Sequence, residues 1–234
     1  MRLLKRIIFA LYSRISNLIR NGYLRSIDFK IQTSISVYYR IIGYWEKMNR
    51  VDFYSKMTLE DLGLNAEEAR HYGGSRSYEL AKVVKRLNLP SDSSVLDFGC
   101  GKGAALYAFS KFPFKGICGI ELSDIAYEIA VENVKNLSLE KRIQVILGDA
   151  RSLKKELDSF NVFYFYNPFP PDVMKTVVQN VIDSLKNKNR DGYLIYNYPI
   201  DSVVIENFNQ IKFMFQYVPF FFGGAIKVYK YNKV

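Results

Sequence analysis

The sequence is poor in the residues that build the commonest metal and nucleophile sites. Its 234 residues include two cysteines, Cys100 and Cys118, and one histidine, His71. The two cysteines do not have the spacing of zinc ligands. A serine–histidine triad or a histidine metal site would depend on His71 alone, which argues against both. A free thiol within a glycine-rich stretch fits a reducing compartment, so we expect a cytoplasmic protein.

A long apolar run is also lacking. The apolar run near the N-terminus is too short to span a bilayer, and no small-residue cleavage pattern follows it, so we expect neither a transmembrane helix nor a signal peptide. Residues 1–21 instead repeat apolar residues at helical spacing: Leu3, Leu4, Ile7, Ile8, Leu11, Ile15, Leu18 and Ile19. This basic amphipathic helix either packs on the protein body or lies on an anionic membrane surface.

The positive charge is concentrated at one end of the chain. The net charge is +10, and residues 1–50 hold ten Lys and Arg against two Asp and Glu, so +8 lies there. The nearly neutral remainder argues against a nucleic-acid partner, which needs clustered cations around its site. A second helix is predicted over about 28–47. We therefore expect a basic helical N-terminal extension over 1–57 and one domain over 58–234.

The stretch from Ser94 to Leu106 organises the rest. It predicts a buried strand over 95–98, followed by three glycines at alternate positions and then by a helix. The glycines are Gly99, Gly101 and Gly103. Glycine permits positive φ and close approach to a ligand. Such a loop offers unpaired N–H groups at a helix N-terminus, which suits a carboxylate or phosphate. Lys102 is not a P-loop lysine, because the surrounding pattern of that motif is absent.

Strands and helices alternate from this stretch onward. Strands are expected at about 95–98, 116–120, 143–147, 162–166, 193–198, 211–218 and 225–231, and helices at about 75–87, 124–137 and 172–185. This order predicts an α/β fold with a doubly wound, mainly parallel seven-stranded sheet. The last two strands, separated by Pro219 and Gly223-Gly224, are expected to form an antiparallel hairpin at the sheet edge.

Polar side chains stand at the ends of the first four strands. Asp97 precedes the glycines, Glu121 ends the second strand, Asp149 follows the third and Asn167 follows the fourth. Each could by itself be a cap or a turn residue. Ligands of doubly wound sheets bind beyond the carboxyl ends of the strands, so their occurrence in order indicates a binding site.

These motifs resemble class I S-adenosylmethionine-dependent methyltransferases. The resemblance spans about residues 75–234 and rests on four motifs: Val95 to Gly103, Gly119 to Ser123, Gly148-Asp149-Ala150 and Asn167-Pro168-Phe169. The first two of these motifs are the specific ones. It implies a Rossmann-like fold whose last strand is antiparallel, S-adenosyl-L-methionine as cofactor and methyl transfer as activity. The cofactor-binding residues that it implies are Asp97, Gly99, Cys100, Gly101, Gly103, Glu121, Leu122, Asp149, Ala150 and Asn167.

The resemblance also implies individual roles. Asp97 and the glycine loop would hold the amino-acid end of the cofactor, Glu121 the ribose hydroxyls, Leu122 the adenine face, and Asp149 with Ala150 the adenine edge. Asn167 and Phe169 would be catalytic residues that face the methyl group and the acceptor. Either Asn167 orients an acceptor nitrogen, or it only shapes a turn.

The acceptor is left open between a small molecule or glycan and a protein amino group. His71 to Leu80, together with Asn167 and Phe169, has a weaker likeness to Dot1-like lysine methyltransferases, although Gly74 stands where that family has glutamate. Two alternatives to an enzyme of this type are a non-catalytic methyltransferase-like binding module and an NAD(P)-dependent oxidoreductase. The glycine spacing favours methyl transfer over the latter. No metal is expected, and the sequence does not indicate an oligomeric state.

Overall fold

A computed structural model of the chain describes residues 24–70, 74, 77–219 and 224–233. It separates into two compact units, Met1–Val51 and Asp52–Val234. The predicted helix over 1–21 lies outside the described residues. The division at residue 57 stays a prediction, and the structural division falls earlier, between Val51 and Asp52.

The described part of the first unit is the helix α2, Leu24–Asn49. This confirms the helix expected over 28–47 and extends it at both ends. The helix ends where Arg50 adopts a left-handed conformation with φ 55°. There the Val51 N–H donates to the Glu46 carbonyl at 3.0 Å, a C-terminal capping bond. Among the helices that the structure describes, none combines the length and apolarity needed to cross a membrane.

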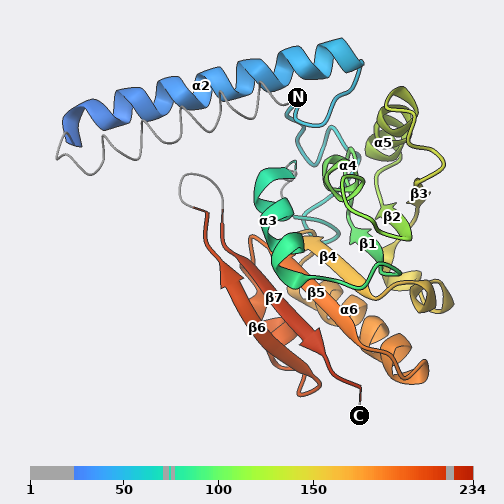
Figure 1. Cartoon of the computed structure of the whole chain (residues 1–234). Helices are drawn as coiled ribbons and strands as arrows, with labels where there is room; N and C mark the ends of the chain where they lie inside the picture. Colours follow the sequence, from blue (N-terminus) through green and yellow to red (C-terminus); the bar gives the residue numbers. More distant parts are fainter. Residues whose placement is uncertain (1–23, 71–73, 75–76, 220–223, 234) are drawn as a thin grey trace. The chain divides into compact units, whose positions relative to one another are not determined.

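The second unit is built on a seven-stranded sheet (Figure 1). Its strands are β1 Ser94–Phe98, β2 Gly116–Glu121, β3 Ile143–Leu147, β4 Val162–Tyr166, β5 Gly192–Asn197, β6 Ile211–Tyr217 and β7 Ile226–Tyr231. The spatial order is β3-β2-β1-β4-β5-β7-β6, and β1 to β5 are parallel. Strand β7 pairs antiparallel with both β5 and β6. The predicted doubly wound sheet with an antiparallel last strand is confirmed.

Helices cover both faces of this sheet. One face packs on α6 (Pro171–Asn187), α7 (Ser202–Glu206) and the 3-10 turns η1 (Ala150–Ser152) and η2 (Lys155–Ser159). The other packs on α3 (Ser77–Leu87), α4 (Ala104–Phe109) and α5 (Asp124–Asn136). Successive β4 residues serve opposite faces, and both faces are buried, which explains why β4 reads as a continuous apolar run. The short elements η1, η2 and α7 were not predicted.

The winding of the sheet reverses beside β1, which lies between β2 and β4. The chain first proceeds from β1 through β2 to β3 at one side, and then crosses back to β4. The connections after β1 and β4 therefore diverge and leave a crevice beyond the strands' carboxyl ends. The candidate site lies at this end of the sheet.

Candidate functional site

A cavity opens beyond the carboxyl ends of β1, β2, β3 and β4. Most of the predicted site residues line it: Asp97, Gly99, Cys100, Gly101, Glu121, Leu122, Asp149, Ala150 and Phe169. Gly103 and Asn167 do not. The strand ends thus converge on one cavity, as the parallel topology requires.

The glycine loop has the conformation that its sequence indicates. Gly99, Gly101 and Gly103 have φ values of 69°, 52° and 84°. A Cβ on Gly99 would lie 2.8 Å from the Cβ of Pro168, closer than side chains tolerate. Glycine is required there because the loop after β1 meets the loop after β4.

The loop's N–H groups differ from expectation, because four of them are already bonded. The N–H groups of Gly99 and Cys100 both donate to the Ile120 carbonyl, at 2.9 and 3.1 Å. Gly101 donates to Glu121 Oε2 at 2.7 Å, and Gly103 donates to the Cys100 carbonyl at 2.9 Å. The expectation of an open N–H cradle for an anion was wrong for these groups. Their bonds fix the loop against β2 instead.

Glu121 is the residue that ties the glycine loop to the second strand. In addition to Gly101, its carboxylate accepts from the N–H groups of Leu122 and Ser123, each at 3.0 Å. Burial raises the pKa of Glu121, although these three N–H groups oppose the shift. Ser123 in turn caps α5, accepting from the Ala126 N–H. The side chain is thereby held rigidly at the cavity wall.

Asp97 is buried, with 2% of its surface exposed. Its carboxyl group has no hydrogen-bond partner within the described parts of the chain. Burial, and then the neighbouring Glu121 carboxylate, raise the pKa of Asp97 well above its ordinary value. A buried carboxyl group without a partner is costly, and a cationic ligand would relieve that cost.

Asp149 is held differently from the other two carboxylates. It accepts from Arg151 Nε at 2.8 Å, pairs with Arg151 Nη2 at 2.6 Å, and caps η1 through the Arg151 N–H. The hydrogen bond from Arg151 is the main cause of the lowered pKa of Asp149. Ala150 and Leu122 add apolar surface beside it.

Asn167 does not line the cavity, although its neighbours do. It adopts φ 43°, and its Oδ1 accepts from the hydroxyl of Tyr196, 3.0 Å away. Tyr166, Pro168 and Phe169 form the wall on this side. The Asn167 side-chain carbonyl is therefore engaged within the fold. Its role in orienting an acceptor stays a prediction.

The chain before α3 also lines the cavity, and it was not among the predicted site residues. Its contributions are Leu59, Leu62, Leu64, Glu68, Ala69, Arg70 and Gly74. The Ser123 hydroxyl donates to the Leu62 carbonyl at 2.7 Å, and the Arg70 N–H donates to the Pro168 carbonyl at 3.0 Å. We call residues 52–70 the strap, because these bonds tie it to the loops after β2 and β4.

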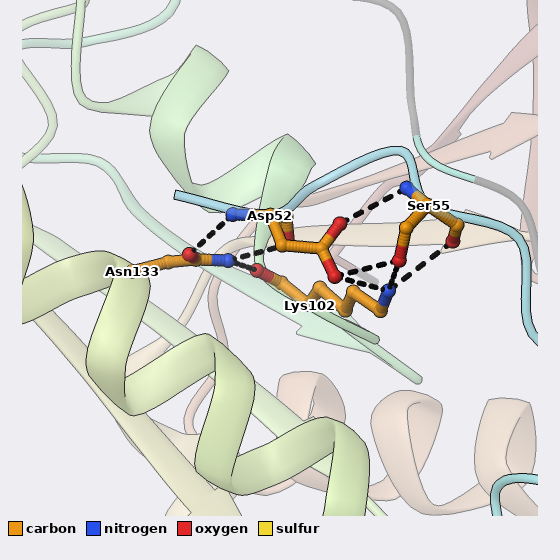
Figure 2. A network of polar contacts seen from close by, with 4 residues as sticks. All are labelled: Asp52, Ser55, Lys102 and Asn133. Carbon is orange, nitrogen blue, oxygen red and sulfur yellow. Dashed lines mark hydrogen bonds and ion pairs between the residues drawn. The ribbon is translucent and has the colours of Figure 1, made fainter. Parts of the chain in front are cut away.

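A polar network fastens the start of the strap beneath the glycine loop (Figure 2). Lys102 Nζ donates to Asp52 Oδ2 at 2.7 Å and to the hydroxyl and carbonyl oxygens of Ser55. Asn133 on α5 accepts from the Asp52 N–H and donates to the carbonyls of Asp52 and Lys102, all within 2.9 Å. The sequence around Lys102 or Asp52 does not reveal this ion pair, since the two residues lie 50 positions apart in the chain.

Arg70 brings a positive charge to the cavity. Its Nη2 lies 3.2 Å from Asp201 Oδ2, and its Nε is buried and has no hydrogen-bond partner among the residues that the structure describes. Of the Dot1-like likeness over His71 to Leu80, residues 71–73 and 75–76 lie outside the described part of the chain.

Comparison with known proteins gives a consistent result. Residues 95–188, from β1 to the end of α6, match a family model described as a methyltransferase domain. The chain is 25% identical over 184 residues to ribosomal protein L11 methyltransferase of Staphylococcus haemolyticus, covering 78% of this chain and 54% of the relative. It is 37% identical over 83 residues to a probable cobalt-precorrin-6B C(15)-methyltransferase (decarboxylating) of Methanococcus maripaludis, covering 36% and 45%.

The chain therefore spans about half the length of these curated relatives. Among solved structures, the m1A22 tRNA methyltransferase TrmK of B. subtilis superposes with a TM-score of 0.54 at 18% identity, covering 68% of this chain and 67% of that one. That likeness concerns the fold. Together, the matched domain and the curated relatives support a class I S-adenosylmethionine-dependent methyltransferase, and the strand order agrees with that resemblance.

Proposed function

We propose that this protein binds S-adenosyl-L-methionine in the cavity and transfers its methyl group to an acceptor. The observation that carries the proposal is the convergence of three carboxyl groups from three successive strand ends, Asp97, Glu121 and Asp149, on one cavity. The resemblance to methyltransferases gives the cofactor class. The convergence of the three carboxyl groups supports the assignment of its site.

The residues present suit a ligand that carries positive charge. The cofactor has a sulfonium and an ammonium group, and the cavity offers the unpartnered, buried Asp97 carboxyl beside Glu121. Opposite charge within a few ångströms favours the ionised carboxylate. Binding of a cation would therefore offset the burial cost that the free protein bears.

The proposed roles follow from the position of each residue. Asp97 holds the cationic part of the amino-acid end, next to the turn of Gly99. Glu121 binds the ribose hydroxyls: Oε2 accepts one bond, from Gly101, and keeps a lone pair for a further donor. Asp149 reads the adenine amino group. Leu122 and Ala150 flank the ring.

The rest of the loop acts through its backbone. Cys100 and Gly103 complete the turn. The Cys100 thiol is buried, which raises its pKa well above the ordinary value, so it is not a nucleophile in this proposal.

The bound cofactor supplies an already activated methyl group, so the protein's contribution is alignment, a suitable electrostatic setting and exclusion of water. Tyr166, Pro168 and Phe169 would form the apolar wall where the acceptor enters. Tyr196, by donating to Asn167 Oδ1, holds the loop that presents them. Asn167 in this proposal shapes the wall through its left-handed backbone, and Phe169 contacts the reacting groups.

The acceptor is proposed as either a small molecule or glycan, or a protein amino group. The relatives are named for a ribosomal protein, a cobalt-precorrin and, among solved structures, a tRNA, so they do not single out one class. Residues 51–234 carry a charge of only +2, which weighs against a nucleic acid.

The test is ligand-induced thermal stabilisation by S-adenosylhomocysteine, followed by transfer of radiolabelled methyl groups into lysate fractions. We expect Asp97→Ala and Glu121→Ala each to abolish the stabilisation, whereas Lys175→Ala, on the exposed side of α6, keeps it. Stabilisation by NAD(P) instead would favour an oxidoreductase. No stabilisation by either ligand in a folded protein would favour a non-catalytic module.

A further inference from the structure

The carboxylates around the cavity leave one part of the proposed ligand unmatched. Asp97 suits the ammonium group, and Glu121 and Asp149 are assigned to the ribose hydroxyls and the adenine amino group, but the amino-acid end of S-adenosyl-L-methionine also carries a carboxylate. Among three acidic groups a carboxylate is repelled unless a cation or several N–H donors face it. If the ligand is the cofactor proposed above, a further group of the protein must bind that carboxylate.

The glycine loop does not supply the donors. The N–H groups of Gly99, Cys100, Gly101 and Gly103 are all bonded within the fold. The helix that follows, α4, is six residues long, too short to act as an anion site by itself. A side-chain cation would supply the missing positive charge.

Among the described residues, three basic side chains line the cavity, and two of them are already engaged. Lys102 has a side chain that is 0% exposed and directs its ammonium to Asp52 and Ser55. Arg151 gives Nε and Nη2 to Asp149, in a two-pronged pair. Moving either would break bonds that organise the cavity wall.

Arg70 is the third, and its guanidinium is only partly engaged. One nitrogen, Nη2, meets Asp201 Oδ2 at 3.2 Å, while Nε is buried and has no hydrogen-bond partner in the described part of the chain. The backbone holds the residue in place, since the Arg70 N–H donates to the Pro168 carbonyl at 3.0 Å. Pro168 is also the residue that a Cβ on Gly99 would meet. Arg70 therefore sits at the β1–β4 side of the cavity, next to the part of the loop assigned to the amino-acid end.

We propose that Arg70 binds the α-carboxylate of the cofactor, with the buried Nε as one of its donors and Asp201 as the positioning residue that holds the guanidinium. A planar guanidinium offers parallel donors that match a carboxylate, which an ammonium does not. Arg70 on the strap and Asp97 on β1 then complement the two charges of one zwitterionic group. The strap becomes part of the binding site, and the cofactor joins it to the sheet.

The experiment compares two ligands on matched variants. S-adenosylhomocysteine carries both the amine and the carboxylate, whereas its decarboxylated analogue, an adenosyl 3-aminopropyl thioether, keeps the amine alone. Binding of each is measured by calorimetry to the full chain and to Arg70→Met, Arg70→Lys and Asp201→Asn. Lys175→Met, which removes one charge from the exposed side of α6, is the control.

The full chain should prefer S-adenosylhomocysteine to the analogue by about ten- to a hundredfold, the worth of a charge-assisted contact. Arg70→Met should lose that preference while binding the analogue unchanged, and Arg70→Lys and Asp201→Asn should keep part of it. Equal losses for both ligands, or no loss for either, would overturn the proposal for Arg70 and leave the proposed function standing. Failure of the unaltered protein to bind either ligand would overturn both.

Discussion

The ion pair between Lys102 and Asp52 predicts an unusual order of mutational effects. The Lys102 side chain is 0% exposed, whereas the Asp52 side chain is 41% exposed. Replacing Asp52 by Ala leaves a buried ammonium that has lost the carboxylate facing it. Replacing Lys102 by Met leaves a carboxylate that reaches water and still accepts from the Ser55 N–H and hydroxyl. The first change should therefore be the more damaging.

The magnitudes follow from the burial of each partner. Removing one partner of a fully buried pair costs about 3–5 kcal/mol. Because Asp52 is partly exposed and the two Ser55 oxygens continue to accept from Lys102, we expect about 2–3 kcal/mol for Asp52→Ala. Lys102→Met keeps an unbranched apolar chain of similar length, so about 1 kcal/mol or less is expected. At about 2–4 °C per kcal/mol for a domain of this size, the melting temperature falls by about 4–12 °C in the first variant.

The double variant gives the sharpest result. Once Asp52 is absent, removing Lys102 also removes the buried charge. Asp52→Ala/Lys102→Met should therefore be more stable than Asp52→Ala alone, which a double-mutant cycle from urea unfolding would record as a coupling of about 1–2 kcal/mol. The Asn133 bonds to the Asp52 backbone are unaffected in all three proteins. A Lys102→Met protein that is less stable than Asp52→Ala would refute this reasoning.

The same pair predicts a dependence on pH. Burial alone would raise the pKa of Asp52, but hydrogen bonds from Lys102 and Ser55 outweigh it, and the pKa lies below its ordinary value of 3.8. A carboxyl group with a lowered pKa stabilises the fold above its unfolded-state pKa and loses that contribution as the pH falls through the folded one. The stability difference between the unaltered protein and Asp52→Ala should therefore shrink below about pH 4.

Two further predictions concern the cavity. Gly99→Ala places a Cβ 2.8 Å from Pro168 at φ 69°. The variant should therefore lose stabilisation by S-adenosylhomocysteine, and its free energy of unfolding in urea should fall by about 1–3 kcal/mol. A variant of unchanged stability would contradict the close approach of the two loops. Asp97 has a raised pKa, so cation binding favours its ionised form, and the affinity for S-adenosyl-L-methionine should increase as the pH rises above 3.8 through that raised value. In calorimetric titrations across this range Asp97→Asn, which cannot ionise, should show a flatter dependence, and identical pH profiles would show that Asp97 does not face the charge.

The fold was predictable because its signals are local. Each parallel strand is a short apolar run, such as β4, bounded by turn residues, and the helix α5 starts at residue 124, as predicted. Alternation of strands and helices along the chain is compatible with only a few sheet topologies. The short elements η1, η2 and α7 escaped prediction because runs of three to five residues have no periodicity to detect.

The candidate site was predictable to the extent that it follows the strand ends. Asp97, Glu121 and Asp149 line one cavity because parallel strands of one sheet end at the same edge. The hydrogen bonds of the glycine loop were not predictable. Three of its N–H groups donate to Ile120 and Glu121, which belong to another strand, so the sequence of the loop does not reveal these acceptors.

The sequence by itself determined the doubly wound sheet, the left-handed glycines and the order of acidic residues along its edge, because hydrophobic period and turn chemistry act between near neighbours in the chain. Only the tertiary structure decided that the strap closes one side of the cavity, that Lys102 is a buried anchor for Asp52, and that Arg70 brings a partly engaged cation to the wall. Those outcomes depend on pairs far apart in sequence. Their energy comes from burial and from mutual charge compensation, which exist only after the chain has folded.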